Sequence, residues 1–368
     1  MKFIIKQINL LKVLKQANLV LVKNNKNPIL ENILIKLKKK KIFLTCSNLE
    51  TELIIKTNVD KEICSGKTTV SGKKLLSICK SFSKNENILI EKKKNFLIIK
   101  IKKIIFKLST LPHSEYPKFT LFKKYNKFSI HAKKFKKIIE KSYFCMAKND
   151  ARYYLNGLFV ILKNNYIQSV STDGYKMAIS TYFLKNENYI TNSVIIAKTG
   201  VLELLKILNE IYEKINILIN NYHLKIITKE IMFTTKLIDG NFPNYRNLII
   251  KNPDTIIEIN LKLLKKTLNR ISILSDSSFY GAKFYIKNNT MKITSQNEEY
   301  ETAEEKILIK KNNNNIIKFN LNTKYFLNIL QHIFSEKVYL LINKNFSTIQ
   351  IQEKKNSLNI YMIMPLIL

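Results

Sequence analysis

The stretch LKNNYIQSVSTD, residues 162–173, has the pattern of a β-hairpin: an apolar strand end, a polar turn and a second, alternating strand. Two other stretches share this pattern, LKKKKIFLTCSN at residues 37–48 and IKNNTMKITSQN at residues 286–297. Their first residues lie 125 and 124 positions apart. The recurrence indicates three copies of one structural plan.

The segments around each hairpin repeat at nearly the same interval. A short strand that runs into an amphipathic helix precedes each hairpin, at residues 3–14, 128–139 and 257–268. A second helix that begins at a small or capping residue follows it, at residues 71–82, 197–208 and 322–334. We therefore expect an α+β fold of three repeated domains, each with two helices packed on antiparallel sheets, at residues 1–124, 125–252 and 253–368. Each copy is long enough to hold its own core.

The charge of the chain is strongly basic, with a formal net charge of +36. A charge of this size usually indicates a polyanionic partner. However, the chain has 60 lysines against three arginines, no Trp and only seven glycines, which is the composition that an AT-rich genome favours in any protein. The total charge alone therefore does not show whether the lysines serve function or reflect mutational drift. The positions of the lysines along the predicted helices have to distinguish the two.

Polar residues recur on one face of each first helix at i, i+3 and i+4 spacing. On a single helix this pattern is typical of a solvated face, but three matching helices favour a basic surface built from all the copies. The polar residues are Lys12, Lys15 and Gln16, then Lys133, Lys137 and Lys141, then Lys262, Lys265, Lys266 and Asn269. The apolar positions on the opposite face include Leu10, Leu11, Leu14, Leu263, Leu264 and Leu268.

Catalytic and metal-binding motifs are not recognisable in the sequence. It has no Gly-rich phosphate loop, no nucleophile motif and no C-x-x-C spacing, and its four histidines are scattered. Asp173-Gly174 is better explained as a turn after a strand. No apolar run approaches the 18 or so residues that span a bilayer. We therefore expect a cytoplasmic protein without a metal, a cofactor, a membrane contact or an enzymatic activity.

Four motifs together carry a family resemblance: RYYLNG at 152–157, STDGYKMA at 171–178, KLIDGNFPNYR at 236–246 and MPL at 364–366. With the triple repeat, they make the whole chain resemble the bacterial DNA polymerase III beta subunit, the DNA sliding clamp. The resemblance implies a ring-shaped homodimer whose helices line a central hole. Such a ring encircles duplex DNA regardless of sequence, is placed there by a clamp loader and tethers the replicative polymerase, which gives processivity in chromosomal replication.

Other polymerases and repair proteins are further partners that the family suggests. The alternative is a basic nucleic-acid-binding or scaffold protein that forms no ring and holds DNA by ordinary electrostatic adhesion.

By resemblance, a pocket for polymerase and loader peptides would use aliphatic, Met and Pro side chains around a few polar atoms, a mixture that suits several apolar peptides. Its residues would be Leu155, Thr172, Gly174, Tyr175, Lys176, Met177, Pro243, Leu248, Met362, Met364, Pro365 and Leu366. The chain has Tyr175-Lys176-Met177 where the family usually has His-Arg-Leu or similar residues.

The resemblance also implies DNA contacts and a dimer interface. The DNA-binding residues would be Lys23, Lys26, Asn149, Arg152, Tyr153, Tyr154 and Lys198, with Lys12, Lys137 and Lys265 on the first helices. The interface would pair Lys74, Ile78, Phe82, Lys103, Phe106 and Leu108 of one subunit with Ile273, Leu274, Glu299, Glu301, Glu304 and Glu305 of the other. Because only the middle copy has Arg-Tyr-Tyr, we expect this cluster to serve function, with Leu155 at the pocket and the other residues facing DNA.

Overall fold

The computed structural model describes residues 1–21, 27–117, 119, 125–163, 165–184, 192–275, 280–354 and 357–366. It splits into two units, the first made of Met1–Lys136 and Thr199–Asp239 and the second of Lys137–Lys198 and Gly240–Leu368. Each unit is described by itself.

The first unit contains two antiparallel sheets. One has the strand order β5-β1-β7-β8-β9, formed by β1 (Lys2–Lys6), β5 (Lys61–Cys64), β7 (Asn87–Lys93), β8 (Phe96–Ile101) and β9 (Ile104–Ser109). The other has the order β6-β2-β3-β4-β17-β16-β15-β10. Its strands are β2 (Asn32–Lys38), β3 (Lys41–Ser47), β4 (Thr51–Asn58), β6 (Gly66–Ser71), β10 (Asn126–His131), β15 (Lys214–Ile219), β16 (His223–Ile227) and β17 (Ile231–Ile238).

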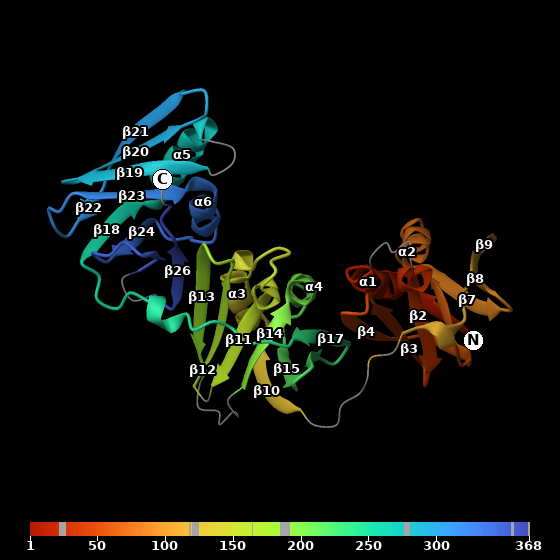
Figure 1. Cartoon of the computed structure of the whole chain (residues 1–368). Coiled ribbons are helices and arrows are strands. Elements are labelled where there is room, and N and C mark those ends of the chain that lie inside the picture. Colours follow the sequence, from red (N-terminus) through yellow and green to blue (C-terminus); the bar gives the residue numbers. More distant parts are fainter. Residues whose placement is uncertain are drawn as a thin grey trace. The chain divides into compact units, whose positions relative to one another are not determined.

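Two helices of this unit, α1 (Gln7–Ala17) and α2 (Gly72–Lys80), lie side by side (Figure 1). Leu10 and Leu14 of α1 are buried at i, i+4 spacing, and each such side chain contributes about 1.5–3 kcal/mol of burial free energy. The Ser71 hydroxyl accepts a hydrogen bond from the Lys74 amide and caps α2. Helix α4 (Lys198–Leu208) follows β14 (Asn192–Ala197), and α3 (Ala132–Glu140) continues from β10.

The second unit also has two antiparallel sheets. The longer has the order β14-β11-β12-β13-β26-β25-β24-β18-β22. Its strands besides β14 are β11 (Gly157–Lys163), β12 (Tyr166–Thr172), β13 (Lys176–Phe183), β18 (Thr255–Asn260), β22 (Lys310–Lys311), β24 (Lys337–Ile342), β25 (Ile349–Gln352) and β26 (Asn359–Ile363). The shorter sheet, β21-β20-β19-β23, consists of β19 (Gly281–Lys287), β20 (Thr290–Gln296), β21 (Thr302–Leu308) and β23 (Ile317–Asn322).

The longer sheet buries side chains on both faces. Tyr361 and Ile363 of β26 belong to a large core with α5 (Leu261–Ile271) and α6 (Thr323–Gln331). Met362, between them, belongs to a smaller cluster with Met177 and Tyr245. Because side chains alternate along a strand, this smaller cluster marks the opposite face of the sheet. The candidate site lies on that face.

The repeated hairpin is confirmed in all three places, where Lys38 pairs with Lys41, Lys163 with Tyr166 and Lys287 with Thr290. The first of these turns is unusual because Lys39 and Lys40 both have positive φ angles, 52° and 54°. Two-residue hairpin turns require this conformation and favour Asn-Gly. Lysine therefore occupies positions where glycine would cost less.

The basic faces expected on the first helices need three corrections. Gln16 is buried, and its amide donates a hydrogen bond of 2.5 Å to Glu210. Lys141 is also buried and forms a 2.5 Å ion pair with Glu353. Leu263, expected in the core, is exposed. Gln16 and Lys141 therefore bind carboxylates that are distant in sequence and do not contribute to a solvated basic face.

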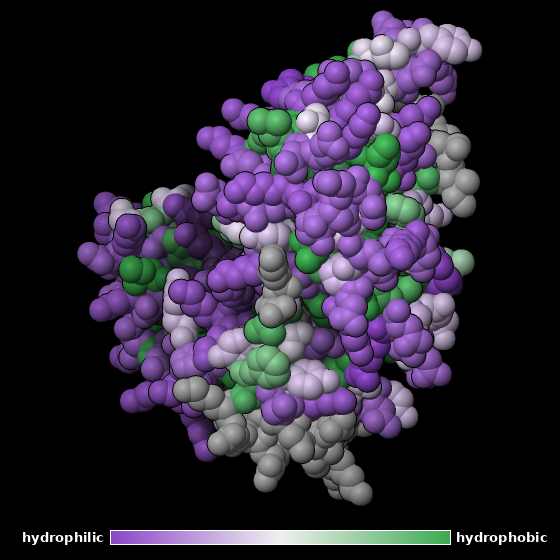
Figure 2. Space-filling model, turned by 90° about the vertical axis from the view of Figure 1, so that its left-hand side faces the viewer, coloured by the Kyte–Doolittle hydropathy of each residue, from purple (hydrophilic) through white to green (hydrophobic). Residues whose placement is uncertain are grey.

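Polar residues cover most of the face shown in Figure 2, and hydrophobic residues appear there as scattered patches between them. Among the described residues, the histidines, cysteines and carboxylates include no group of three that could hold a metal ion. Within the same residues, no helix is long and apolar enough to cross a membrane.

Candidate functional site

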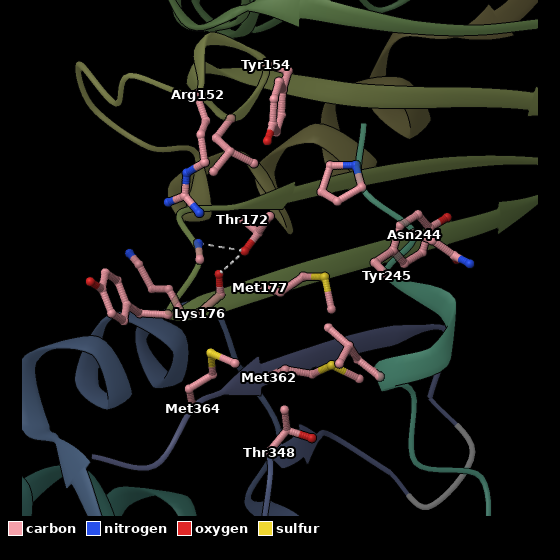
Figure 3. Close-up of a pocket in the computed structure, with 15 residues that line it drawn as sticks. Arg152, Tyr154, Thr172, Lys176, Met177, Asn244, Tyr245, Thr348, Met362 and Met364 are labelled. Atoms are coloured by element: carbon pink, nitrogen blue, oxygen red, sulfur yellow. Dashed lines mark hydrogen bonds between the residues drawn. The ribbon is translucent and has the colours of Figure 1, made fainter. Parts of the chain in front are cut away.

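A cavity of about 200 Å³ opens on the face of the long sheet that carries the smaller cluster (Figure 3). Ten of the twelve residues expected in the pocket line it: Leu155, Thr172, Gly174, Tyr175, Lys176, Met177, Pro243, Leu248, Met362 and Met364. Pro365 and Leu366 are half-buried and are not among its lining residues. Arg152, Tyr154, Asn244, Tyr245 and Thr348 also line the cavity and were not expected there.

The rim between β12 and β13 is a tight polar turn. The Thr172 hydroxyl accepts a 3.0 Å hydrogen bond from the Gly174 amide and donates one of 2.8 Å to the Lys176 carbonyl (Figure 3). The Asp173 carboxylate accepts hydrogen bonds from the amides of Tyr175 and Lys176. Gly174 has a φ of +94°, which favours glycine. The turn predicted for Asp173-Gly174 is therefore present, and it fixes the backbone beside the cavity.

Methionine side chains form much of the cavity floor. Met177 of β13 and Met362 of β26 are cross-strand partners, and both are buried. Met364 follows β26 and is 43% exposed, while its amide donates a 2.8 Å hydrogen bond to the Tyr175 carbonyl. Methionine is unbranched and polarisable, so this floor can adapt to apolar side chains of different shapes.

The ammonium group of Lys176 is held by groups outside the cavity lining. Its Nζ donates hydrogen bonds of 3.1 Å to the Phe144 carbonyl and 2.9 Å to Asn328 Oδ1, and the side chain is only 10% exposed. Lys176 therefore offers the cavity its aliphatic stem, which packs as an apolar surface.

The segment NDARYYLNG folds into a closed loop that supports the opposite wall. Arg152 binds Asp150 through two side-chain hydrogen bonds of 3.0 Å, and these bonds lower the pKa of the Asp150 carboxyl below its usual value. Asn156 exchanges hydrogen bonds with the Asp150 backbone. The loop leads into the short helix η4 (Tyr153–Asn156), whose Leu155 is buried against the cavity.

Two residues of this segment that were expected at DNA also line the cavity. Arg152 and Tyr154 were expected to face DNA, but both line the same cavity as Leu155 (Figure 3). Tyr153 is 57% exposed, and its ring lies close to Gly240. Asn149 is exposed in the left-handed conformation. DNA contact by any of these residues stays a prediction.

The lysines expected at DNA have different surroundings. Lys12 is exposed and forms a 2.9 Å ion pair with Glu230, and Lys137 is exposed on α3. The Lys198 ammonium donates hydrogen bonds to the carbonyls of Met146 and Ala147, and burial lowers its pKa. Burial likewise lowers the pKa of Lys265. Lys23 and Lys26 lie outside the described residues.

The residues expected at one side of a dimer interface surround the edge strand β9. The rings of Phe82 and Phe106 meet edge to face at 5.9 Å. Leu108 on β9 and Ile78 on α2 are half-buried, and Lys74 and Lys103 are exposed. A half-buried apolar group along a sheet edge is a usual template for pairing with another chain.

The residues expected at the other side surround the edge strand β21 of the second unit. Ile273 is 77% exposed and Leu274 is half-buried. Three of the four glutamates expected at the interface, the acidic run of this edge, already have partners within the chain. Glu305 binds Arg270, Glu304 binds Lys292, and Glu301 accepts a hydrogen bond from Asn297. Glu299 is exposed. Part of the acidic run is therefore explained without a second subunit.

The repeated hairpins and this pocket are the features expected of a protein of the DNA-clamp class. Comparison with known families agrees. The N-terminal, central and C-terminal domain models of the DNA polymerase III beta subunit match residues 1–120, 129–244 and 246–367.

Beta sliding clamps are similar over the full length of this chain and of their own. The identity is 37% for a Buchnera aphidicola clamp, 33% for the Haemophilus influenzae clamp and 30% for the Escherichia coli K12 clamp. The crystal structure of the Pseudomonas aeruginosa beta subunit matches all of both chains with 30% identity and a TM-score of 0.96. The Thermotoga maritima beta subunit, 22% identical with a TM-score of 0.91, supports the fold.

The chain belongs to the DNA polymerase III beta subunit family, the bacterial sliding clamps. It is a DNA sliding clamp that confers processivity on a polymerase, and it is not an enzyme.

Proposed function

We propose that the cavity beside Met177 and Met362 is the place where this clamp holds the replicative polymerase, by taking up a short apolar peptide. The observation that carries the proposal is the gathering of ten residues, expected from sequence motifs scattered between positions 155 and 364, around one cavity. The apolar floor, the polar rim at Thr172 and the aliphatic stem of Lys176 suit an extended peptide with apolar side chains.

The size of the cavity argues for moderate affinity. Two or three buried anchor side chains contribute about 1.5–3 kcal/mol each, and ordering of the peptide offsets part of this. Because 1 µM corresponds to about −8 kcal/mol, we expect a dissociation constant of roughly micromolar or weaker for the peptide alone. Such contacts let several partners exchange on one clamp, and a clamp loader is among the partners that we propose.

We further propose that two copies close the ring, β9 of one copy pairing with β21 of the other. Phe106 and Leu108 on β9, and Ile273 in the short helix after α5, would make the apolar contact. Exposed charges such as Lys103 and Glu299 would flank it. Lysines on the first helices would then contact phosphates. Each such contact is weak and independent of sequence, as sliding requires.

Deleting Met364–Leu368 tests the pocket. The truncation removes the exposed Met364 side chain and the hydrogen bond between the Met364 amide and Tyr175. We expect fluorescence anisotropy to show that the purified polymerase catalytic subunit no longer binds, while light scattering still gives a mass near twice 43.2 kDa. The matched control is Tyr212→Ala, which changes an aromatic residue that is 84% exposed and does not line the cavity. Unchanged polymerase binding by the truncated clamp would show that the pocket is assigned wrongly.

DNA topology tests the ring. A loaded clamp should stay on closed circular DNA at moderate salt and leave after the circle is cut, because the link is topological rather than electrostatic. Retention on linear DNA with free ends would contradict a closed ring.

Two narrower proposals complete this function. We place the protein in the cytoplasm, with the DNA that it serves. We also propose domain boundaries after residues 124 and 252, which limited proteolysis followed by mass spectrometry would test.

A further inference from the structure

A second cavity, of about 590 Å³, lies in the same unit as the first. Its floor is formed by Ile256 of β18, Leu341 of β24, Gln352 of β25 and Ile360 of β26. A wall is formed by the segment Ile249–Lys251 and by Leu358. Cavities of this volume are typical of ligand sites.

The two cavities open on the same face of the long sheet. On β26, Met362 lines the first cavity and Ile360 the second, while Tyr361 between them faces the large core. Thr348, directly before β25, and Gln350 on β25 alternate in the same way around Ile349. Since a strand rises about 3.3 Å per residue, these floor positions are only about 7 Å apart.

The chain between Leu248 and Ile250 forms a fixed wall shared by the two cavities. Leu248 lines the first cavity, and Ile249 and Ile250 line the second. The side chain of Gln350 accepts a 2.8 Å hydrogen bond from the Ile250 amide and donates one of 3.3 Å to its carbonyl. Ile250 is thereby held in place, so the second cavity is formed before any ligand binds.

The chemistry of the second cavity indicates what would fill it. Leu358 is 47% exposed at its edge, while Leu341 is buried at its floor. Among the described residues that line it, Lys251 is the charged one, and it is exposed. An apolar side chain on the floor and a carboxylate beside Lys251 would satisfy these groups.

We infer that the second cavity binds the part of the polymerase chain that flanks the segment held in the first cavity, through an apolar and an acidic side chain. The inference rests on the proposed role of the first cavity. A segment anchored there places its flanking residues within a few residues' reach of Leu358 and Lys251. The second contact is then intramolecular and adds affinity at little further entropic cost.

The test uses two peptides from the organism's own polymerase catalytic subunit. Overlapping peptides first identify the shortest one that binds the clamp and loses binding when Met364–Leu368 is deleted. A longer peptide adds eight native residues on each side. Isothermal titration should show the longer peptide binding about tenfold more tightly, the gain of one good additional contact.

Leu358→Asp and Lys251→Glu should each remove most of this gain and leave the affinity of the short peptide unchanged. Matched controls are Ile316→Asp, at a residue 54% exposed, and Lys287→Glu, at an exposed lysine, neither of which lines a cavity described above. Unchanged binding of the short peptide also shows that each variant is folded.

Four outcomes would overturn the inference. Equal affinity of the two peptides, or a gain that survives both substitutions, would show that the second cavity is not used. An equal loss for both peptides would mean that the substitutions act through the first cavity. If no peptide depends on Met364–Leu368, the proposed role of the first cavity fails, and the inference fails with it.

Discussion

Replacement of Glu203 by Gln should make the stability of the clamp less dependent on pH. Glu203 lies on α4 with a side chain only 7% exposed, where it accepts hydrogen bonds of 2.5 Å from Thr51 and 2.9 Å from Asn48. Burial raises the pKa of Glu203 to about 7 from its ordinary value of 4.5. The Glu50 carboxylate adds to this effect, while the two hydrogen bonds and Lys206 oppose it.

The sign of the pH dependence follows from the proton that Glu203 holds in the folded chain. Between pH 4.5 and 7 the folded chain holds a proton on Glu203 that the unfolded chain has lost, so the free energy of unfolding falls as the pH rises through this window. One pKa unit corresponds to about 1.4 kcal/mol, so the full effect above pH 7 is at most about 3.5 kcal/mol. Glutamine keeps both hydrogen bonds, since its oxygen accepts from Asn48 and its amide donates to the Thr51 hydroxyl. The substitution removes only the negative charge that the Glu203 carboxylate carries at high pH.

The measurement is the thermal unfolding midpoint of the wild type and of Glu203→Gln from pH 5 to pH 8.5. The variant should match the wild type near pH 5 and exceed it by a few degrees at pH 8.5. Glu336→Gln, at an exposed carboxylate that belongs to no site described above, is the matched control and should show no such divergence. Parallel curves for the wild type and Glu203→Gln would refute the reasoning, because they would mean that Glu203 titrates alike in the folded and unfolded chains.

Gly174→Ala should weaken polymerase binding because a Cβ at this positive φ strains the cavity rim. The expected loss is roughly 1–2 kcal/mol, the usual cost of a left-handed backbone at a residue with a Cβ. An unchanged Kd in fluorescence anisotropy would contradict this. Lys40→Gly should raise the free energy of unfolding by about 1 kcal/mol by relieving its positive φ, and Lys36→Gly, within β2, should lower it. The double substitution Ile273→Ala and Leu274→Ala should yield monomers in light scattering, since each anchor contributes about 2–5 kcal/mol if it is fully buried between subunits. A dimer that persists at nanomolar concentration would remove these two residues from the interface.

The repeat and its hairpins were predictable from sequence because they depend on local rules. These rules are the alternation of apolar residues, the polar turn and the helix cap, and each acts within a few positions. The cap at Asn322, for example, accepts a hydrogen bond from the Tyr325 amide. Ten of the twelve residues expected in the pocket meet at one cavity, because Thr172 and Met177 are close in sequence and the tail motif directly follows β26, which pairs with β13.

The failures share a different cause. Gln16 and Lys141 bind Glu210 and Glu353, which are 194 and 212 positions away, and no periodicity along a helix reveals such partners. The place of Arg152 at the cavity was also not expected, because its loop turns back on Asp150. The closed loop could have been inferred from the spacing of Asp150 and Arg152 and from the nearby Asn156. No local pattern, however, predicts that Arg152 lies beside Gly174.

The pairing of Arg152 with Asp150 has a consequence for a chain that otherwise relies on lysine. Its guanidinium makes two side-chain bonds to one carboxylate, and Arg270 binds Glu305 through two nitrogens in the same way. A lysine there would keep the charge but lose the paired geometry that fixes the orientation of the carboxylate. Two of the three arginines thus occupy positions where the orientation of the bound carboxylate matters as well as its charge. Replacement of Arg152 by Lys would therefore loosen the wall of the cavity that Arg152 lines.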